Sequence, residues 1–355
     1  MNNRNGKRNV YPEQCARRET TKSIVCSYTK LLEAEKRCLR KVLYKNSVSR
    51  FDLNVLTRVY ELRKELINET YTTSQGQVFE VYEPKYRRVT STKFKDRIPQ
   101  ASFVVNYIYP KIISKHTYAN CACVKYKGVD YARNLFKEIL KESNRYSDYC
   151  LKVDFKDYFG SINHNIMFKE LSEYMSEKWT MKYFQDVINC NHQDIGIGLG
   201  SEINQLSAVT LPHHIDEKFI NNRYLRYMDD IIFIGSKNEC KYALDYIRKE
   251  TNRLNISISE KKTYIQRIYK PIKFLGFTFL LKSNKVVTLK RIKQKLNNEK
   301  RKLRKIKNVC VPIDRVNEHY QSVRSVMVKG NRSGLIKLDK YFNKLFREEL
   351  QNAIN

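Results

Sequence analysis

Two adjacent aspartates, Asp229 and Asp230, lie between two apolar segments in the stretch 223–235, Arg-Tyr-Leu-Arg-Tyr-Met-Asp-Asp-Ile-Ile-Phe-Ile-Gly. The apolar residues on both sides predict a β-hairpin that carries the two carboxylates at its tip. Most aspartate pairs belong to solvated turns, but two neighbouring anions in an apolar setting are costly unless a cation balances them. The hairpin therefore indicates a candidate cation site.

A third acid, Asp154, ends another short apolar strand, Tyr-Cys-Leu-Lys-Val-Asp at 149–154. If the two strands are neighbours in one sheet, three carboxylates meet at one site. Oxygen ligands of this kind are those that Mg²⁺ prefers, with the remaining positions left for water and substrate phosphate. The set predicts a two-metal phosphoryl-transfer centre, in which one ion activates a 3′-hydroxyl and the other stabilises the leaving pyrophosphate.

The chain has a large positive charge. It has 355 residues, and its 68 Lys and Arg against 37 Asp and Glu give a formal net charge of +31. Hydrophobic residues (41%) and aromatic residues (12%) are enough to fill ordinary cores, so we expect two or three domains or one elaborated domain. The surplus charge fits a nucleic acid, an anionic membrane surface or an acidic protein, and composition alone does not choose among them.

The sequence indicates a cytoplasmic protein with no membrane-spanning segment. No stretch approaches the roughly 18 uncharged apolar residues of a membrane helix. The first residues, Met-Asn-Asn-Arg-Asn-Gly-Lys, lack the apolar core of a secretory signal. The nine cysteines are scattered without paired metal-ligand spacing, which indicates reduced and mostly buried thiols.

Helical and strand patterns are interleaved along the chain, which predicts an α+β fold. Helical patterns occur within 1–75, at 132–140, 165–190 and 240–247, and in a helix that begins near Ser201. Strands are expected at 149–155, 254–258 and 273–279, and the basic stretch 86–97 suits exposed strands or a hairpin. Eleven basic residues and one acid follow a helical seam at 285–307, so we expect a separate helical domain at 285–355.

The chain resembles reverse transcriptases, because five of that family's motifs occur in the family's order. They are similar to the first palm motif (Val153–His164), the glycine loop and helix (Ile197–Ala208), the signature hairpin (Tyr227–Asp230), the lysine motif (Ser259–Thr263) and the primer-grip turn (Phe274–Phe277). Phe94–Arg97 and residues 118–128 resemble fingers motifs of bacterial, non-retroviral reverse transcriptases, and residues 325–338 resemble their helical thumb.

The resemblance implies a right-hand polymerase with fingers, palm and thumb. The boundaries expected on this basis are an N-terminal helical leader at 1–80, fingers at 81–150, a palm at 151–280 with a fingers insertion at about 165–195, and a basic helical thumb at 285–355. The leader is the part to which the resemblance assigns no role.

The resemblance also implies which groups are catalytic. Three carboxylates and one backbone carbonyl would bind two Mg²⁺ ions, with Mn²⁺ as a possible substitute: Asp154, Asp229, Asp230 and the carbonyl of Phe155. Lys262 would donate a proton to the leaving pyrophosphate or screen its charge. The adjacent Lys261 leaves the choice of lysine open.

Five residues are expected to contact the incoming nucleotide: Lys95, Arg97, Phe159, Gly200 and Gln205. Lys95 and Arg97 are candidates for the triphosphate, because lysine supplies a point charge and arginine a bidentate fork. Phe159 occupies the position where the family has an aromatic gate against the ribose 2′-hydroxyl, which implies DNA synthesis. Gly200 would let the backbone approach a ligand, and Gln205 would hydrogen-bond in the groove of the base pair.

Two positions in the glycine loop and its helix depart from the family. Many relatives have proline where this chain has Gly198, and serine where it has Asn204. The departures indicate either an unusual preference for template or nucleotide or a simple structural difference in the loop.

Six further residues are expected to contact primer or template. Three belong to the primer-grip turn and three to the basic thumb helix, whose charge suits the phosphates of a template–product duplex or of a structured RNA: Phe274, Leu275, Gly276, Lys293, Arg301 and Arg304.

The function that the resemblance implies is RNA-directed DNA synthesis from dNTPs, on a dedicated noncoding RNA and with a role in antiphage defence. A diversity-generating or retron reverse transcriptase is an alternative, as are template-independent or protein-primed synthesis and a noncatalytic RNA-binding scaffold. The length leaves no room for an endonuclease, integrase or RNase H domain, so we expect dependence on an RNA and on an accessory protein or a second copy of the chain.

Overall fold

The structure is a computed structural model that contains two compact units. It describes residues 20–82, 87–175, 177–191, 193–282, 285–289, 292–309, 311–328 and 332–352. One unit comprises Met1–Lys115 and Ile162–Leu211, and the other comprises His116–Ser161 and Pro212–Asn355. Both contain helices and strands, which confirms the α+β class.

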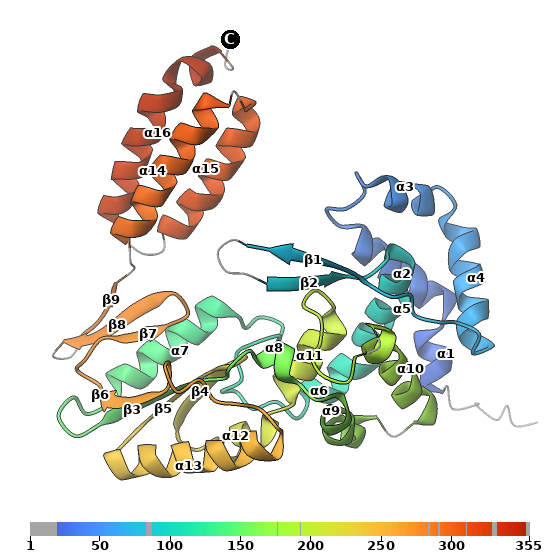
Figure 1. Cartoon of the computed structure of the whole chain (residues 1–355), viewed down its shortest axis with the longest axis horizontal. Coiled ribbons are helices and arrows are strands. Elements are labelled where there is room, and N and C mark those ends of the chain that lie inside the picture. The colour runs from blue at the N-terminus through green and yellow to red at the C-terminus, as the bar shows by residue number, and fades with distance from the viewer. Residues whose placement is uncertain are drawn as a thin grey trace, which may run out of the picture. The chain divides into compact units, whose positions relative to one another are not determined.

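The first unit consists of helices and one β-hairpin (Figure 1). Its main elements are α1 Thr21–Val25, α2 Tyr28–Leu39, α3 Asn46–Asp52, α4 Val55–Ile67, β1 Gln77–Val81, β2 Arg87–Ser91, α5 Phe94–Phe103, α6 Tyr109–Ile113, α9 His164–Leu171, α10 Lys178–Ile188 and α11 Glu202–Thr210. A π-helical segment, Val104–Ile108, joins α5 to α6. Helix α2 buries Leu31, Ala34 and Cys38, the one-sided spacing of an amphipathic helix.

Two predictions in this unit need correction. The leader boundary at residue 80 divides one hairpin, because β1 pairs along its length with β2 in antiparallel register. The basic stretch 86–97 is only half strand: β2 ends at Ser91, and helix α5 begins at Phe94 with Asp96 in its first turn. A helix start favours such an acid, because the carboxylate faces the positive end of the helix dipole.

The second unit is built around a four-stranded sheet in the order β4-β5-β3-β6 (Figure 1). Its strands are β3 Tyr149–Asp154, β4 Arg223–Tyr227, β5 Asp230–Gly235 and β6 Tyr264–Arg267, and a second sheet consists of β7 Ile272–Phe274, β8 Phe277–Lys282 and β9 Lys285–Leu289. The helices packed with these sheets are α7 Val129–Lys141, α8 Tyr158–Ser161, α12 His213–Lys218 and α13 Lys237–Arg253.

The two faces of the four-stranded sheet have different partners. On one face, Leu225 and Ile232 join Phe136 of α7 and Phe279 of β8 in one buried cluster. On the other face, Phe233 packs edge-on against a phenylalanine that follows α12, with ring centroids 5.3 Å apart. Alternating side chains on each strand therefore fill two cores.

Two predicted strands differ in the structure. Residues 254–258 alternate in burial, but Leu254 and Asn255 form the turn that follows α13, with a φ of 55° at Asn255. Only Ile258 forms a bridge, with Phe155, and the fourth strand of the sheet is β6. Alternating burial alone produced that pattern, without a ladder of hydrogen bonds. Residues 273–279 form the end of β7, a turn and the start of β8, since Leu275 and Gly276 have φ values of 44° and 80° that reverse the chain.

The C-terminal part of the second unit is a bundle of α14 Ile292–Asn308, α15 Ile313–Val328 and α16 Arg332–Asn352. Its core contains Leu303, Tyr320 and Phe342, and the rings of Tyr320 and Phe342 stack with centroids 3.8 Å apart. The predicted start of this helical domain at residue 285 is too early, because β9 extends the sheet by pairing with β8.

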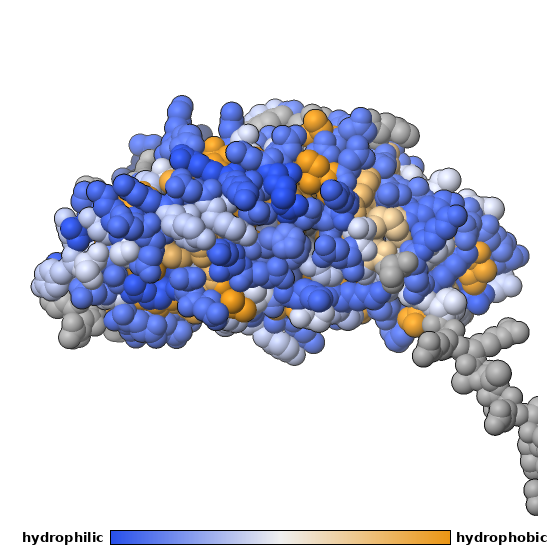
Figure 2. Space-filling model, turned by 90° about the horizontal axis from the view of Figure 1, so that it is seen from below, coloured by the Kyte–Doolittle hydropathy of each residue, from blue (hydrophilic) through white to orange (hydrophobic). Residues whose placement is uncertain are grey.

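The surface agrees with the polar composition. The face drawn in Figure 2 is mainly hydrophilic, and hydrophobic residues are scattered over it. Among the described residues, no helix has the length and apolar character needed to cross a membrane.

Candidate active site

Three aspartates meet at one end of the four-stranded sheet. Asp154, the last residue of β3, is the register partner of Asp230, the first residue of β5. Asp229 lies in the turn that joins β4 to β5, and its carbonyl accepts a hydrogen bond from the Phe155 amide over 3.4 Å. The structure thus brings together the acids that the sequence predicts, and it places the Phe155 backbone beside them.

Two lysines balance part of this negative charge. The Nζ atom of Lys262 lies 2.5 Å from Oδ1 of Asp154, and the hydrogen bond to this carboxylate raises the pKa of the ammonium group. The Nζ atom of Lys152 lies 3.1 Å from Oδ1 of Asp230. Burial, and then the neighbouring Asp230, raise the pKa of Asp229 to about 6.

The donor set suits a divalent cation. Asp154 is only 6% exposed. Three carboxylates this close together repel one another unless positive charge lies between them. The buried Oδ1 atom of Asp230 accepts no well-aligned hydrogen bond from the described residues, although Lys152 is close to it. Hard carboxylate oxygens with unused acceptor capacity are the ligands that Mg²⁺ and Mn²⁺ bind.

Backbone contacts bring the lysine motif to the acids. The amide of Ser259 donates to the carbonyl of Asp154 over 2.8 Å, and the amide of Lys156 donates to Ser257 over 2.8 Å. A tight turn then follows, in which the Lys262 amide donates to Ser259 over 3.0 Å. This geometry distinguishes Lys262 from Lys261, because the Lys262 ammonium reaches the first aspartate.

Phe159 lies on α8, five residues after Asp154. Its ring packs edge-on against Tyr158 with centroids 5.8 Å apart, and Tyr158 in turn contacts the ring of Phe155 at 5.2 Å. Phe159 is half-buried, so a chain of aromatic contacts fixes the ring while part of its surface stays open.

A cavity of about 460 Å³ in the first unit contains three of the predicted nucleotide contacts. It is lined by α2, β1, β2, one side of α5, the glycine loop and the start of α11, including Arg97, Gly200 and Gln205. Lys95 lies elsewhere, since its ammonium pairs with Glu65 of α4 at 2.8 Å. Positions 95 and 97 are about 200° apart around a helix, so the structure separates the two predicted triphosphate ligands.

The glycine loop lies directly against β2. The Thr90 amide donates to the Leu199 carbonyl over 3.0 Å, and a Cβ atom at Gly200, whose φ is +122°, would lie 2.9 Å from the Thr90 carbonyl oxygen. The two departures from the family are themselves in contact, because the Asn204 side chain donates to the Gly198 carbonyl over 2.8 Å. Glycine at positions 198 and 200 permits the close approach of the loop to β2.

The predicted primer-grip turn is held by a residue that the sequence did not reveal. Arg133 of α7 donates from Nε and Nη2 to the Leu275 carbonyl over 3.2 and 2.5 Å, and its guanidinium lies 4.0 Å from the centroid of the Phe277 ring. Phe274 is buried in the core beside Phe136, so the turn at Leu275 and Gly276 presents backbone to the outside.

The basic residues of α14 differ in their surroundings. Arg301 is exposed, whereas Arg304 donates from Nε to the Tyr341 hydroxyl over 2.5 Å and is partly used in packing against α16. The side chain of Lys293 lies outside the described residues.

Several supporting residues were absent from the sequence-based set: Arg133, Lys152, Asp216 and Arg226. They share one signal, a charged residue in an otherwise apolar strand or on a buried helix face, where an unpaired charge would be costly. That signal indicates that the charge has a polar partner but does not identify the partner.

A protein family and a relative that match this sequence bear on the identity of the site. The family described as reverse transcriptase (RNA-dependent DNA polymerase) matches residues 84–279. The putative COX1/OXI3 intron 1 protein of Saccharomyces cerevisiae is 22% identical over 52% of this chain, and this chain spans only 29% of that protein.

Two solved structures give a weaker likeness. The apo telomerase of Candida tropicalis has a TM-score of 0.44 and 13% identity, covering 63% of this chain and 49% of that chain. The same telomerase truncated from its C-terminal domain has a TM-score of 0.43 and 13% identity, covering 62% and 58%.

The family match contains the three aspartates and all five motifs from Val153 to Phe277. It also covers more than half of the chain, and on these grounds the protein belongs to the reverse transcriptase family.

Proposed function

We propose that the protein is an RNA-directed DNA polymerase that adds deoxynucleotides to a 3′-hydroxyl. The observation that carries the proposal is the pairing of Asp154 with Asp230 beside the turn that holds Asp229, in a chain of this family. The arrangement matches the carboxylate set that phosphoryl-transfer enzymes need.

The chain's own groups would have the following roles. Asp154, Asp229 and Asp230 supply carboxylate ligands, with the Phe155 carbonyl as a further donor. Two Mg²⁺ ions, or Mn²⁺ in their place, would activate the attacking 3′-hydroxyl and stabilise the pyrophosphate. The ammonium of Lys262, whose pKa is raised by its hydrogen bond with Asp154, would screen the leaving group or give it a proton.

We propose that Phe159 excludes ribonucleotides and that the cavity beside Arg97, Gly200 and Gln205 takes part of the nascent base pair or the triphosphate. The support is the fixed ring of Phe159 and the polar lining of the cavity. Lys95 is left out of this assignment, because Glu65 already neutralises its charge at a different surface.

The glycine loop gives a first test of the assignment. We expect Gly198→Ala and Gly198→Pro to lower kcat/KM for a deoxynucleotide by about tenfold or more, since small displacements at a reacting site are costly. A Cβ atom at this position would lie 2.6 Å from Oγ1 and 2.7 Å from Cβ of Thr90, so the loop or β2 must move. Single-nucleotide incorporation measures the effect.

Rescue separates the clash from other causes. Adding Thr90→Gly to Gly198→Ala removes the atoms that collide and should restore most of the lost efficiency, although glycine weakens a strand. Normal kinetics in the Gly198→Pro protein would show that the close approach of loop and strand has no part in catalysis.

We propose that the natural template is a structured RNA. The support is the charge of +31, the exposed basic residues of α14, and the similarity to the putative COX1/OXI3 intron 1 protein. RNA affinity should therefore fall steeply with salt, and Arg301→Ala should lower the slope of log K against log [salt] by about one phosphate contact. Fluorescence anisotropy at several salt concentrations measures the slope.

A matched arginine serves as the control. Arg248 of α13 is also exposed, but its guanidinium pairs with Glu260 at 3.2 Å, so Arg248→Ala should leave the slope unchanged. An affinity that hardly changes between low and physiological salt would mean that the positive charge does not bind the RNA backbone.

One experiment separates the proposed activity from its alternatives. The protein is purified with its bound nucleic acid, and both the RNA and any DNA product are sequenced. A complementary DNA supports the proposal, a homopolymer attached to the protein indicates protein-primed or template-independent synthesis, and RNA without any product indicates a noncatalytic scaffold. Antiphage defence, the accessory partner and the cytoplasmic location remain predictions from the sequence.

A further inference from the structure

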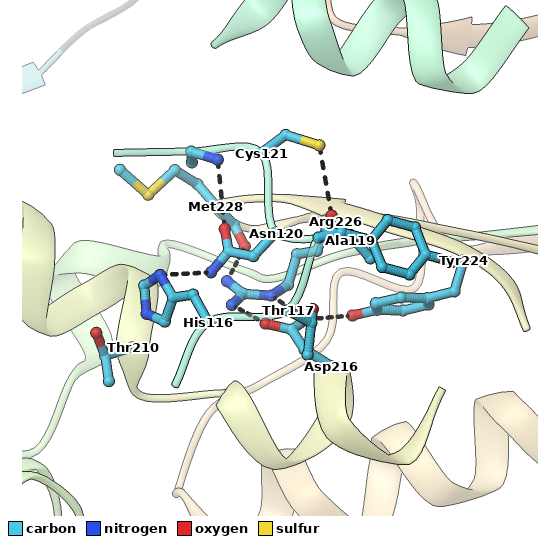
Figure 3. A network of polar contacts seen from close by, with 12 residues as sticks. His116, Thr117, Ala119, Asn120, Cys121, Thr210, Asp216, Tyr224, Arg226 and Met228 are labelled. Atoms are coloured by element: carbon cyan, nitrogen blue, oxygen red, sulfur yellow. Dashed lines mark hydrogen bonds and ion pairs between the residues drawn. The ribbon is translucent and has the colours of Figure 1, made fainter. Parts of the chain in front are cut away.

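A fully buried arginine lies on β4, three residues before Asp229 (Figure 3). Arg226 donates from Nε to Oδ1 of Asp216 over 2.8 Å and from Nη2 to Oδ2 over 2.5 Å, a bidentate ion pair. The Tyr224 hydroxyl also donates to Oδ1 of Asp216, over 2.7 Å. These contacts fix the plane of the guanidinium.

The remaining nitrogen of the guanidinium holds the active-site turn. Nη1 of Arg226 donates to the carbonyl of Met228 over 3.0 Å (Figure 3). Met228 has a φ of +55°, a left-handed conformation that costs free energy in a residue with a side chain. Such a conformation persists where surrounding contacts determine it, and the Arg226 hydrogen bond is such a contact.

The backbone of Arg226 is fixed as well. Its amide donates to the Ala119 carbonyl over 2.9 Å, and its own carbonyl accepts from the Cys121 amide over 3.0 Å. The segment containing these residues therefore lies along the outer edge of β4, which is an edge strand of the sheet. Arg226 is held from both its main chain and its side chain, so its donor to Met228 has little freedom.

Stability alone does not explain why the chain has a buried ion pair at this place. Burial alone would lower the pKa of Arg226, but the Asp216 carboxylate outweighs it and the pKa is raised, so the guanidinium stays charged. Apolar residues of similar volume often replace a buried ion pair without loss of stability. What apolar side chains would not supply is a donor for the Met228 carbonyl.

We propose that Arg226 is a positioning residue, which fixes the Met228 carbonyl and thereby the backbone that carries Asp229 and Asp230. Asp216 and Tyr224 orient the guanidinium for this contact. The catalytic consequence rests on the proposed polymerase function, whereas the positioning of the turn does not.

The test removes the network without leaving a buried charge unpaired, and it takes away the donor to the Met228 carbonyl. In the variant Asp216→Leu/Tyr224→Phe/Arg226→Met, both charges and the hydroxyl are replaced together. Hydrogen exchange of a peptide covering 227–231, measured by mass spectrometry, should become about tenfold faster. The kcat for single-nucleotide incorporation should fall about tenfold, with KM for the nucleotide changed less than twofold.

A second variant covers failure of the triple variant to fold. Arg226→Lys keeps the charge opposite Asp216 but has no planar fork, so it cannot make the bidentate pair and reach Met228 together. It should fold, and it should show the same faster exchange in the turn.

The control is an ion pair at the other end of the same strand. Arg223 pairs with Asp148, so Arg223→Met/Asp148→Asn should change stability without changing exchange in the turn. Folded Arg226 variants with parental exchange and kcat would overturn the inference. Faster exchange in a protein whose parent incorporates no nucleotide would instead overturn the proposed function and leave the positioning role in place.

Discussion

Asp229→Asn is expected to abolish nucleotide incorporation, with a loss of at least about a thousandfold, or ~4 kcal/mol. The carboxylate lies in the turn beside the paired Asp154 and Asp230, where an amide cannot replace the negative charge that divalent cations require. Single-turnover incorporation of one deoxynucleotide on a primed RNA measures the loss.

The same variant should be more stable than its parent when divalent ions are removed. The pKa of Asp229 is raised to about 6, mainly by burial, so the charged form is disfavoured in the folded state. The penalty is fully present above pH 6 and is lost as the pH falls toward the unfolded value near 4, because the group is then protonated in both states. Melting in EDTA should favour the variant by about 1–3 kcal/mol at pH 8 and hardly at all near pH 4.

An acid outside the cluster serves as the control. Asp245 of α13 is exposed, and Asp245→Asn should change neither incorporation nor the melting temperature. An Asp229→Asn protein that polymerises normally would remove the carboxylate assignment. An unfolded one would show instead that the side chain is needed for the fold.

Phe159→Ala is expected to admit ribonucleotides, raising their kcat/KM relative to deoxynucleotides by on the order of a hundredfold, or ~2.7 kcal/mol. The ring is fixed by Tyr158, so its bulk cannot turn aside for a 2′-hydroxyl. The ratio is measured with matched deoxy- and ribonucleoside triphosphates on one template.

Phe159→Tyr is the matched control, because it keeps the ring and should keep the discrimination. Unchanged sugar selectivity in the alanine variant would mean that Phe159 is an ordinary packing residue. A fall in both rates together would indicate a general loss of structure around α8 rather than loss of a sugar gate.

The grouping of the three aspartates could be predicted from the sequence, because it depends on strand patterns that are visible locally. Each acid follows or precedes a short apolar strand, and strand ends at one edge of a sheet bring such residues together across long chain separations. Residues 254–258 show the limit of this reasoning, since their alternation reflects burial on one side, while the backbone forms a turn at Leu254 and Asn255 and a single bridge at Ile258.

Contacts between side chains distant in the chain could not be predicted in this way. Lys95 and Arg97 appear equivalent in the sequence, but helix α5 turns one toward Glu65 and the other toward the cavity. The contacts from Arg133 to Leu275 and from Arg226 to Asp216 depend on how helices pack on sheets, which no local pattern contains.

The antiparallel register of β3 and β5 restricts how this protein can change in length. Deleting or inserting one residue within either strand would turn every following side chain to the opposite face and separate Asp154 from Asp230. A change farther from the acids, such as in residues 142–147 before β3, leaves that pairing intact. Insertions and deletions during evolution should therefore accumulate in such connections, and engineered tags or domains are best placed there.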